Sequence, residues 1–492
     1  MKRRTWLLGA AGAAGALVVG WAAIPPRSRM GKGELLAPKD GEIAFNGWIK
    51  VAADGSVVMA MPRAEMGQGV HTALPMLVAE ELDLPLARMR IEQAGGHAIY
   101  GNVAMLVASL PFHPLESEGP ALPRKIAFAR RMVAKVAREL GINATGGSSS
   151  VADAWDIVRL AAATVRARLV EAAAVQWQVA RGEITVAEGV VRHPSGKQAH
   201  FGELARLAAV TTPTEVVLKP RERWTLLGRN VPRVDVPSKV DGSAQFGLDV
   251  RVPDMRFAAI RHCPMLGGRL GTFDAAAVSS QPGVERVLAV PAQAGSTAAV
   301  AVVARTWWQA QQAVQALQVS WLPPESGALD SARIQADLEA AARQGDGHCF
   351  YEKGNVAQAE TQISSKSLEA VYHAPYLAHA TLEPMNCTAQ VKDGAVTLWA
   401  PTQVPQMARA VAARVAGVDV DRVTLHQTLL GGGFGRRLDV DFVAQAVHIA
   451  QAAEGRAVQL IWSREEDTQH DFYRPQHVAR LRATLSSEGV PP

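Results

Sequence analysis

The sequence of 492 residues has only three cysteines, Cys263, Cys349 and Cys387, which are far apart. An iron–sulfur cluster normally takes about four cysteine thiolates, and a structural zinc site takes about four ligands. The cysteine content therefore predicts neither kind of site, and we expect no metal ligands in this chain. If the chain takes part in redox chemistry, its electrons must leave through another subunit.

Aromatic and charged residues are also modest in number, at 5% and 20% of the sequence. The net charge is +5, the basic residues are scattered, and no stripe combines basic with aromatic side chains. These features exclude nucleic acid as an expected partner. Hydrophobic residues make up 48% of the chain, a globular value that permits large cores. At about 150 residues per domain, the length predicts roughly three domains.

The one long apolar run lies at the N-terminus. It follows Lys2-Arg3-Arg4-Thr5-Trp6 and continues to Ile24. A basic start with a twin arginine predicts export to the periplasm by the twin-arginine route. Only Gly20-Trp21-Ala22 resembles a cleavage site, and the run is about long enough to span a bilayer. An uncleaved inner-membrane anchor and a chance apolar leader therefore remain as alternatives.

Neither common nucleotide-binding fingerprint is present, although a glycine loop is. The segment from Arg422 to Gly455 predicts a strand, the loop Gly431-Gly432-Gly433-Phe434-Gly435-Arg436-Arg437 and a helix. A Rossmann fingerprint would need glycine in place of Arg436, and the loop lacks the end of a P-loop. Glycines bring backbone N–H groups close to a ligand, and the helix start and both arginines add positive charge. The loop suits an anion, a phosphate or a metal-oxo group, or it is simply a tightly packed turn.

Two further loops have a similar character. Residues 46–53 and 56–61 predict a hairpin that leads into Gly67-Gln68-Gly69 and a helix containing Leu74 and Leu77. There the Gln68 amide either reaches a ligand or faces solvent, and the nearby His71 is either a ligand or a hydrogen-bonding residue. The run Thr145-Gly146-Gly147-Ser148 precedes a helix predicted over 153–179. Its hydroxyl groups are either ordinary N-caps or part of a third anion cradle.

The middle of the chain predicts a compact α+β domain over 227–321. Short strands are expected at 240–247, 257–260, 287–290 and 300–303, followed by a helix at 306–317 and a closing strand at 319–321. Residues 323–354 have the composition of a linker.

Several short motifs follow one another along the chain, namely Glu65-Met66-Gly67-Gln68-Gly69-Val70-His71-Thr72, Lys239-Val240-Asp241-Gly242, Leu382-Glu383-Pro384-Met385-Asn386, Pro401-Thr402-Gln403 and Gly431-Gly432-Gly433-Phe434-Gly435. Together these motifs make the chain resemble the molybdenum-binding large subunit of the xanthine oxidase and aldehyde oxidase family. It looks most similar to the exported isoquinoline oxidoreductase type, which is permuted relative to xanthine oxidase.

The resemblance implies a multidomain α+β fold in which permuted parts of a cofactor-binding domain flank a hammerhead-like domain. The expected boundaries are 1–30 for the signal or anchor, 31–215 for the N-terminal part of the molybdopterin-binding domain, 216–322 for the hammerhead-like domain, 323–367 for the linker and 368–492 for the part with the glycine loop.

The resemblance also implies an oxidoreductase that inserts oxygen from water into an N-heterocycle or oxidises an aldehyde. Its cofactor would be molybdenum bound to molybdopterin cytosine dinucleotide. By residue-to-residue correspondence, Gln68 would hydrogen-bond a molybdenum oxo group and act in catalysis. The other cofactor-binding residues would be Gly67, Gly69, Thr145, Gly146, Gly147, Ser148, Gly432, Gly433, Phe434, Gly435 and Arg436.

The family also implies partners. A small subunit with two [2Fe–2S] clusters would take the electrons, and a cytochrome or membrane acceptor would follow it. A small molecule would be the substrate.

Two departures from the family pattern affect these expectations. The loop continues as Arg436-Arg437-Leu438, where xanthine oxidase has glycine, lysine and glutamate. The family's general base, a glutamate in a Gly-Val-Gly-Glu type motif, has no counterpart in this chain. Residues 479–485 alternate as a strand, and the turn at 486–489 has no strand after it. We therefore expect a C-terminally incomplete chain, and the alternative to an enzyme is an inactive remnant or scaffold.

Overall fold

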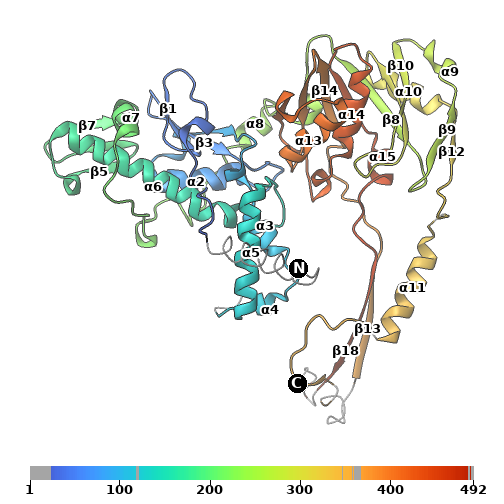
Figure 1. Cartoon of the computed structure of the whole chain (residues 1–492), viewed down its shortest axis with the longest axis horizontal. Coiled ribbons are helices and arrows are strands. Elements are labelled where there is room, and N and C mark those ends of the chain that lie inside the picture. Colours follow the sequence, from blue (N-terminus) through green and yellow to red (C-terminus); the bar gives the residue numbers. More distant parts are fainter. Residues whose placement is uncertain are drawn as a thin grey trace, which may run out of the picture. The chain divides into compact units, whose positions relative to one another are not determined.

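The computed structural model describes residues 24–117, 121–327, 329–345, 347–356, 358, 367–485 and 488. The chain divides into two compact units. The described residues of the first unit lie within 24–111, 121–244 and 403–406, and those of the second lie within 112–117, 245–402 and 407–488 (Figure 1). The predicted twin-arginine leader, up to residue 23, lies outside the described residues. Among the helices that the structure describes, none has both the length and the apolar character to cross a bilayer.

The first unit contains a four-stranded sheet in the order β1-β2-β3-β4. Its strands are β1 (Glu42–Ala44), β2 (Ile49–Ala52), β3 (Val57–Met61) and β4 (Met89–Gln93). The predicted hairpin is confirmed, because β2 and β3 pair antiparallel around a turn in which Gly55 has φ +78°. Strand β4 pairs parallel with β3, and helix α2 (Val70–Leu82) lies between them in sequence. The Gln68 loop therefore connects β3 to the start of α2.

Helices cover this sheet and form the core of the first unit. Buried side chains of α2, of α6 (Ser150–Trp177) and of α7 (Phe201–Val210) pack with those of β2 and β3. The helix predicted over 153–179 is thus present with shifted ends. The remaining elements are α3 (Val103–Ala108), α5 (Arg124–Leu140), α8 (Val236–Val240), β5 (Thr185–Ala187), β6 (Val190–Arg192) and β7 (Gln198–His200).

The strand expected at 240–247 is wrong. Val240 ends helix α8, which has Pro237 in its first turn, and Gly242 follows with φ +81°. Proline favours a helix start, and a left-handed glycine interrupts extended backbone, so this sequence forms a short helix and a turn.

The second unit is built on a seven-stranded sheet in the order β10-β11-β8-β17-β14-β15-β16. Its strands are β8 (Arg256–His262), β10 (Val284–Val290), β11 (Ala299–Ala304), β14 (Asn386–Lys392), β15 (Ala395–Ala400), β16 (Val423–Gln427) and β17 (Val458–Ile461). The β8–β17 and β15–β16 pairs are parallel, and the other neighbours are antiparallel. Strands from the middle of the sequence thus continue one sheet with strands from its last quarter.

Helices pack on this sheet. Residues of α14 (Asp441–Gln451) and α13 (Pro405–Ala416) share a core with β14, β15 and β17. Helix α10 (Trp307–Ala316) packs with β8 and β11 in a smaller core, as expected for the helix at 306–317. Further elements of this unit are α4 (Pro114–Ser117), α9 (Ala276–Ser279), α11 (Ser331–Gln344), α15 (Arg464–Gln469), β9 (Arg269–Phe273) and β12 (Val319–Leu322).

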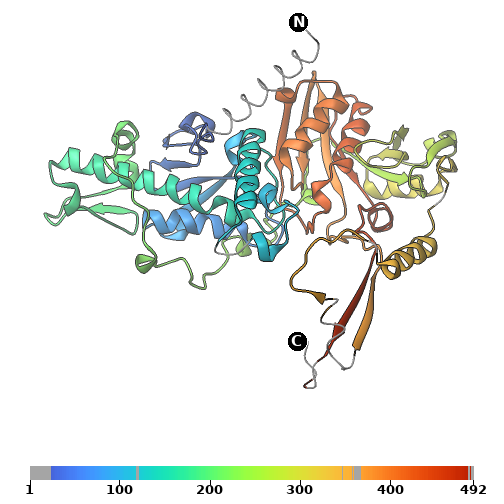
Figure 2. The ribbon, with the colours of Figure 1, turned by 60° about the horizontal axis from the view of Figure 1, so that its bottom comes forward.

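The strand predicted at 479–485 is confirmed as β18 (His477–Thr484). It pairs antiparallel with β13 (Ser367–Ala374), from Ser367 opposite Thr484 to Ala374 opposite His477. Its partner therefore precedes it in sequence, whereas the alternating pattern suggested a hairpin partner after it. Figure 2 shows this two-stranded ribbon extending away from the seven-stranded sheet.

Candidate functional site

The glycine loop connects β16 to α14 in the second unit. Gly432, Phe434 and Gly435 all have positive φ, at 100°, 54° and 106°. A 3₁₀ turn, η8 (Arg436–Leu438), follows the loop, and α14 begins at Asp441. The left-handed backbone explains the glycines at 432 and 435, because side chains rarely tolerate it. Phe434 adopts it with its side chain 73% exposed.

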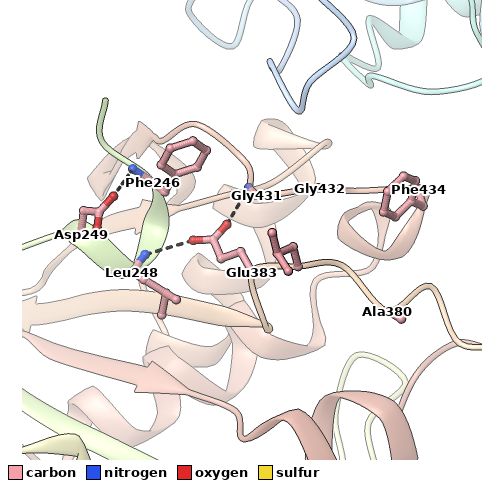
Figure 3. Close-up of a pocket in the computed structure, with 9 residues that line it drawn as sticks. Phe246, Leu248, Asp249, Ala380, Glu383, Gly431, Gly432 and Phe434 are labelled. Carbon is pink, nitrogen blue, oxygen red and sulfur yellow. Dashed lines mark hydrogen bonds between the residues drawn. The ribbon is translucent and has the colours of Figure 1, made fainter. Parts of the chain in front are cut away.

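The carboxylate of Glu383 organises this loop. It lies at the centre of the contacts in Figure 3, where Oε2 accepts the N–H of Gly431 at 2.8 Å and Oε1 accepts the N–H of Leu248 at 3.0 Å. The Arg437 guanidinium also donates to Oε2, at 3.1 Å. Glu383 is buried, so these bonds replace the water that its charge loses.

Four consecutive amides of the loop remain open. Within the described part of the chain, the N–H groups of residues 432, 433, 434 and 435 have no hydrogen-bond acceptor. Buried or half-buried backbone N–H groups normally find a partner, so a row of open amides is a feature of anion-binding loops. This observation supports the cradle interpretation of the glycine loop over the simple packed turn.

The two arginines after the loop are buried and paired within the protein. Arg436 makes a two-bond contact with Asp441 at 2.8 and 2.9 Å, and its Nε lies 3.2 Å from Asp471. Arg437 bonds Glu383 and donates to the carbonyl of Gly432 at 2.9 Å. Burial lowers the pKa of Arg437 to about 10, although Glu383 opposes the shift. The positive charge expected at the loop is thus largely neutralised, and both arginines brace the loop from inside. A contact of Arg436 with a cofactor stays a prediction.

A pocket of about 600 Å³ opens beside the open amides. Gly431, Gly432 and Phe434 line it on one side, and Phe246 and Leu382 add apolar surface. Figure 3 shows Phe246, Leu248 and Glu383 around the same space. The site therefore combines apolar walls with backbone donors, as small-molecule and cofactor sites do.

In the Gln68 loop of the first unit, a nearby acidic residue accepts the backbone N–H groups. Glu65 is buried, and its carboxylate accepts the N–H groups of Gly67 at 2.9 Å, Gly69 at 3.1 Å and His71 at 3.0 Å. The Gln68 amide donates to the carbonyl of Ala64 at 2.8 Å, and its oxygen accepts the N–H of Met66 at 2.8 Å. The backbone of this loop is therefore not an anion cradle, because Glu65 occupies it. The contact between the exposed Gln68 side chain and a metal-oxo group stays a prediction.

His71 lies at the start of α2 and makes an internal contact. Its Nε2 is 3.2 Å from the carbonyl oxygen of Arg63. Burial lowers the pKa of His71, against the opposing charge of Glu65. These contacts match the hydrogen-bonding alternative that the sequence left open.

The Thr145 segment lies directly beside the Gln68 loop in the first unit. The Thr145 hydroxyl accepts the N–H of Ala64 at 2.9 Å, and the carbonyl of Ala64 accepts a hydrogen bond from the Gln68 amide. Gln403 bonds both the N–H and the carbonyl of Thr145. Of the described residues, none accepts the N–H groups at 146, 147 and 148, which precede the 28-residue helix α6. This turn thus keeps the donors that an anion requires.

A buried ion-pair cluster fixes the two segments of the first unit. The Asp153 carboxylate, in the first turn of α6, accepts Arg63 at 2.7 Å and Arg29 at 2.7 Å. Arg63 also donates to Asn143 at 2.7 Å. The cluster joins the strand end before Gln68 to the turn before α6, so their mutual geometry is rigid.

Sequence reasoning missed the structural roles of Glu65 and Glu383. Each carboxylate accepts backbone N–H groups of a glycine-containing loop. For Glu65 a signal existed, since an acidic residue two positions before a Gly-x-Gly run can fold back on it. Glu383 lies 48 positions from Gly431, so no local pattern indicates this contact.

Two family models match the chain, both described as a molybdopterin cofactor-binding domain, at residues 341–490 and 10–103. The beta chain of isoquinoline 1-oxidoreductase from Brevundimonas diminuta is 30% identical, over 91% of this chain and 58% of the relative. Membrane-bound aldehyde dehydrogenase [pyrroloquinoline-quinone] of Gluconacetobacter polyoxogenes is 28% identical, over 92% of this chain and 54% of the relative. A nicotinate dehydrogenase subunit of Pseudomonas putida is 27% identical, over 93% of this chain and 35% of the relative.

Among solved structures, the quinoline 2-oxidoreductase from Pseudomonas putida 86 matches with a TM-score of 0.42 and 19% identity, over 52% of this chain and 37% of that chain. The chain spans roughly half the length of the first two curated relatives.

The matched domains and the open amides of the glycine loop define a molybdopterin-binding protein. More particularly, the chain belongs to the xanthine oxidase family of molybdopterin-binding large subunits. Its mixed helix-and-sheet, multidomain architecture agrees with the fold class expected from the sequence.

Proposed function

We propose that this chain is the molybdenum-binding large subunit of an exported oxidoreductase that hydroxylates an N-heterocycle or oxidises an aldehyde. One observation in the structure supports this most directly: four consecutive loop amides lie open beside an apolar pocket. The matched relatives are named as oxidoreductases and dehydrogenases, so a scaffold or inactive remnant is not favoured.

The residues present fit a molybdopterin cofactor. Amides 432–435 would hold an oxo or other anionic group, and amides 146–148 would hold a phosphate of the dinucleotide, which we propose to be the cytosine form. When bound, the molybdenum centre supplies a two-electron oxidation with water as the oxygen source. Glu383 and Arg437 keep the loop amides in place, and Phe246 and Leu382 provide an apolar wall for the substrate.

Gln68 would donate its amide hydrogen to an oxygen at the metal. In the structure one hydrogen of that amide donates to the Ala64 carbonyl, and the second hydrogen is the one that would reach the cofactor. Its bonds to Ala64 and Met66 hold the amide in place, and one preorganised donor in a water-shielded site is worth roughly 3–4 kcal/mol.

Electron transfer requires a partner. Two of the three curated relatives reported above are themselves named as subunits. With three scattered cysteines the chain supplies no iron–sulfur relay, so we propose a small subunit with two [2Fe–2S] clusters and a cytochrome or membrane acceptor after it. The twin arginine at residues 3 and 4 supports export to the periplasm, with an inner-membrane anchor if the leader stays uncleaved.

The test is metal and nucleotide analysis of the full-length protein produced together with the small subunit. We expect about one molybdenum and one cytosine nucleotide per large subunit, and turnover of an N-heterocycle or an aldehyde. Protein that is folded and paired but contains no molybdenum would contradict the proposal. Finding pyrroloquinoline quinone instead would assign this chain the cofactor in the name of the Gluconacetobacter relative.

A further inference from the structure

A cluster of two histidines and a glutamate lies in the second unit, outside the glycine-loop site. His262 ends strand β8, and Glu466 and His470 lie on and just after helix α15. One ligand atom from each of the three residues lies within 4.8 Å of the others. All three side chains are largely buried, at 0%, 15% and 10% exposure. Neither the proposed cofactor site nor any sequence motif accounts for this grouping.

We propose that His262, Glu466 and His470 bind a zinc-class divalent cation. Two imidazole nitrogens and one carboxylate oxygen form a set that Zn²⁺ accepts, with a fourth position for water. At ordinary Zn–N and Zn–O lengths, neighbouring ligand atoms of a tetrahedral site lie about 3.3–3.5 Å apart. His470 Nε2 already lies 3.4 Å from Glu466 Oε2.

The distance between His262 and Glu466 is shorter than this tetrahedral spacing because a hydrogen bond joins the two side chains. His262 Nδ1 lies 2.6 Å from Glu466 Oε2, which is a hydrogen-bond distance. Replacing that proton by a cation requires this pair to open by about 0.7 Å to reach the tetrahedral spacing. Glu466 lies in the short helix α15 and His470 follows that helix at the edge of a pocket, so small side-chain rotations supply this opening.

A buried glutamine lies directly behind His262 and can hold its ring in a metal-binding orientation. Gln445 is fully buried, its amide group contacts His262 Nε2 at 2.8 Å, and its Oε1 has no partner among the described residues. A metal on Nδ1 forces the remaining hydrogen of His262 onto Nε2. Exchanging the amide oxygen and nitrogen of Gln445, which are nearly indistinguishable by shape, then lets Oε1 accept that hydrogen. Gln445 thereby becomes the outer partner that metal-binding histidines usually have.

The remaining features agree with a hydrated cation. A pocket of about 660 Å³ lined by His262, His470 and Trp462 gives water access to the fourth position. Without a cation, the 3.4 Å contact between His470 and Glu466 is only a loose ion-pair distance.

The experiment uses tag-free, chelator-treated full-length protein titrated with Zn²⁺ by calorimetry and with Co²⁺ as an optical probe. We expect one tight site per chain and a Co²⁺ spectrum of a four-coordinate nitrogen and oxygen site. Glu466→Gln and His470→Asn should each weaken Zn²⁺ binding at least 100-fold, and Gln445→Ala should weaken it about 10- to 100-fold. His448→Asn, on the same helix as Gln445 but outside the cluster, is the matched control and should bind like the parent.

Several outcomes would overturn the proposal. One is the absence of stoichiometric Zn²⁺ binding to the parent, and another is equal binding by parent, Glu466→Gln and His470→Asn. Circular dichroism checks that the variants fold, and if neither does, a parent Co²⁺ spectrum typical of an aquo ion would itself refute the site. Molybdenum content is measured in parallel, so this result does not depend on the proposed function.

Discussion

The Glu383 carboxylate accepts the N–H of Gly431 at 2.8 Å, while the N–H of Glu383 donates to the Gly431 carbonyl at 3.0 Å. This reciprocal contact brings the two backbones so close that a Cβ on Gly431 would lie 2.3 Å from the Cβ of Glu383. The first glycine of the loop is therefore required by packing, and not by an unusual φ.

Gly431→Ala should consequently destabilise the second unit and disturb the loop. Overpacking of this kind costs about 1–3 kcal/mol, and the neighbouring atom is part of a side chain that Arg437 and Leu248 hold in place. Chemical denaturation measures the loss, and molybdenum content of the full-length protein should fall with it. Gly95→Ala is the control, since a Cβ there meets nothing within 4 Å. Equal stability of the two variants would show that the loop accommodates the added Cβ without strain.

Glu383→Gln should have a larger effect than its size suggests. The change leaves the buried guanidinium of Arg437 without its carboxylate, and breaking a buried ion pair from one side costs about 3–5 kcal/mol. Glu369→Gln removes an exposed partner of Arg480 and should change the free energy of unfolding by less than about 1 kcal/mol. Denaturation midpoints of the two variants give the comparison. Similar losses of unfolding free energy would mean that Glu383 does not stabilise the loop.

Gln68→Ala in the full-length enzyme should lower turnover about a hundred- to a thousandfold at equal molybdenum loading. Gln68→Glu keeps an oxygen that accepts the N–H of Met66, and it loses the donor both to the metal and to the Ala64 carbonyl. We expect both variants to lose turnover at equal molybdenum loading, because both lose the donor. Turnover within threefold of the parent in both would place another residue at the metal.

Because of Glu80, we expect the first unit to lose stability as the pH becomes acidic. Its burial opposes ionisation, but hydrogen bonds from Lys219 and from the N–H groups of Leu227, Leu226 and Thr225 outweigh it and lower the pKa to about 2. The folded-state pKa lies below the ordinary value of 4.5, so the stabilisation is complete above that pH and is lost as pH falls toward 2.

Glu80→Gln should therefore cost about 2–3 kcal/mol at pH 7, as expected for lost hydrogen bonds to a charged group. The difference from the parent should shrink steadily between about pH 4.5 and pH 2. Urea denaturation at several pH values measures it, with the exposed Glu34→Gln as control. A difference that stays constant over that range would contradict the assigned ionisation.

Local signals predicted much of the fold. The Asp54-Gly55 turn, the helix over 306–317 and the strand–glycine loop–helix around Gly431 follow from residue spacing within one segment. The strand expected at 240–247 failed because a proline at 237 and a left-handed Gly242 outweighed its apolar residues. Local composition therefore predicted best those elements whose contacts join residues close together in the sequence.

The contacts within the candidate site could not be predicted from local sequence. Arg436 and Arg437 suggested exposed charge next to glycines, and only the tertiary structure brings Asp441, Asp471 and Glu383 against them. The Gly67–Gly69 loop looks like an anion cradle by spacing, yet Glu65 occupies its amides. In both cases the decisive partner is a buried carboxylate whose orientation composition does not reveal.

The parallel pairing of β8 with β17 has a consequence for biosynthesis. Arg256 lies opposite Val458 in the ladder, about 200 residues later in the chain. At roughly 5–20 residues per second, the ribosome takes about 10–40 s to deliver the partner strand. Throughout that interval one side of β8 presents unbonded N–H and C=O groups, which are a template for pairing with other chains. The edge of β8 that β17 later covers is therefore exposed until translation reaches the last tenth of this sequence.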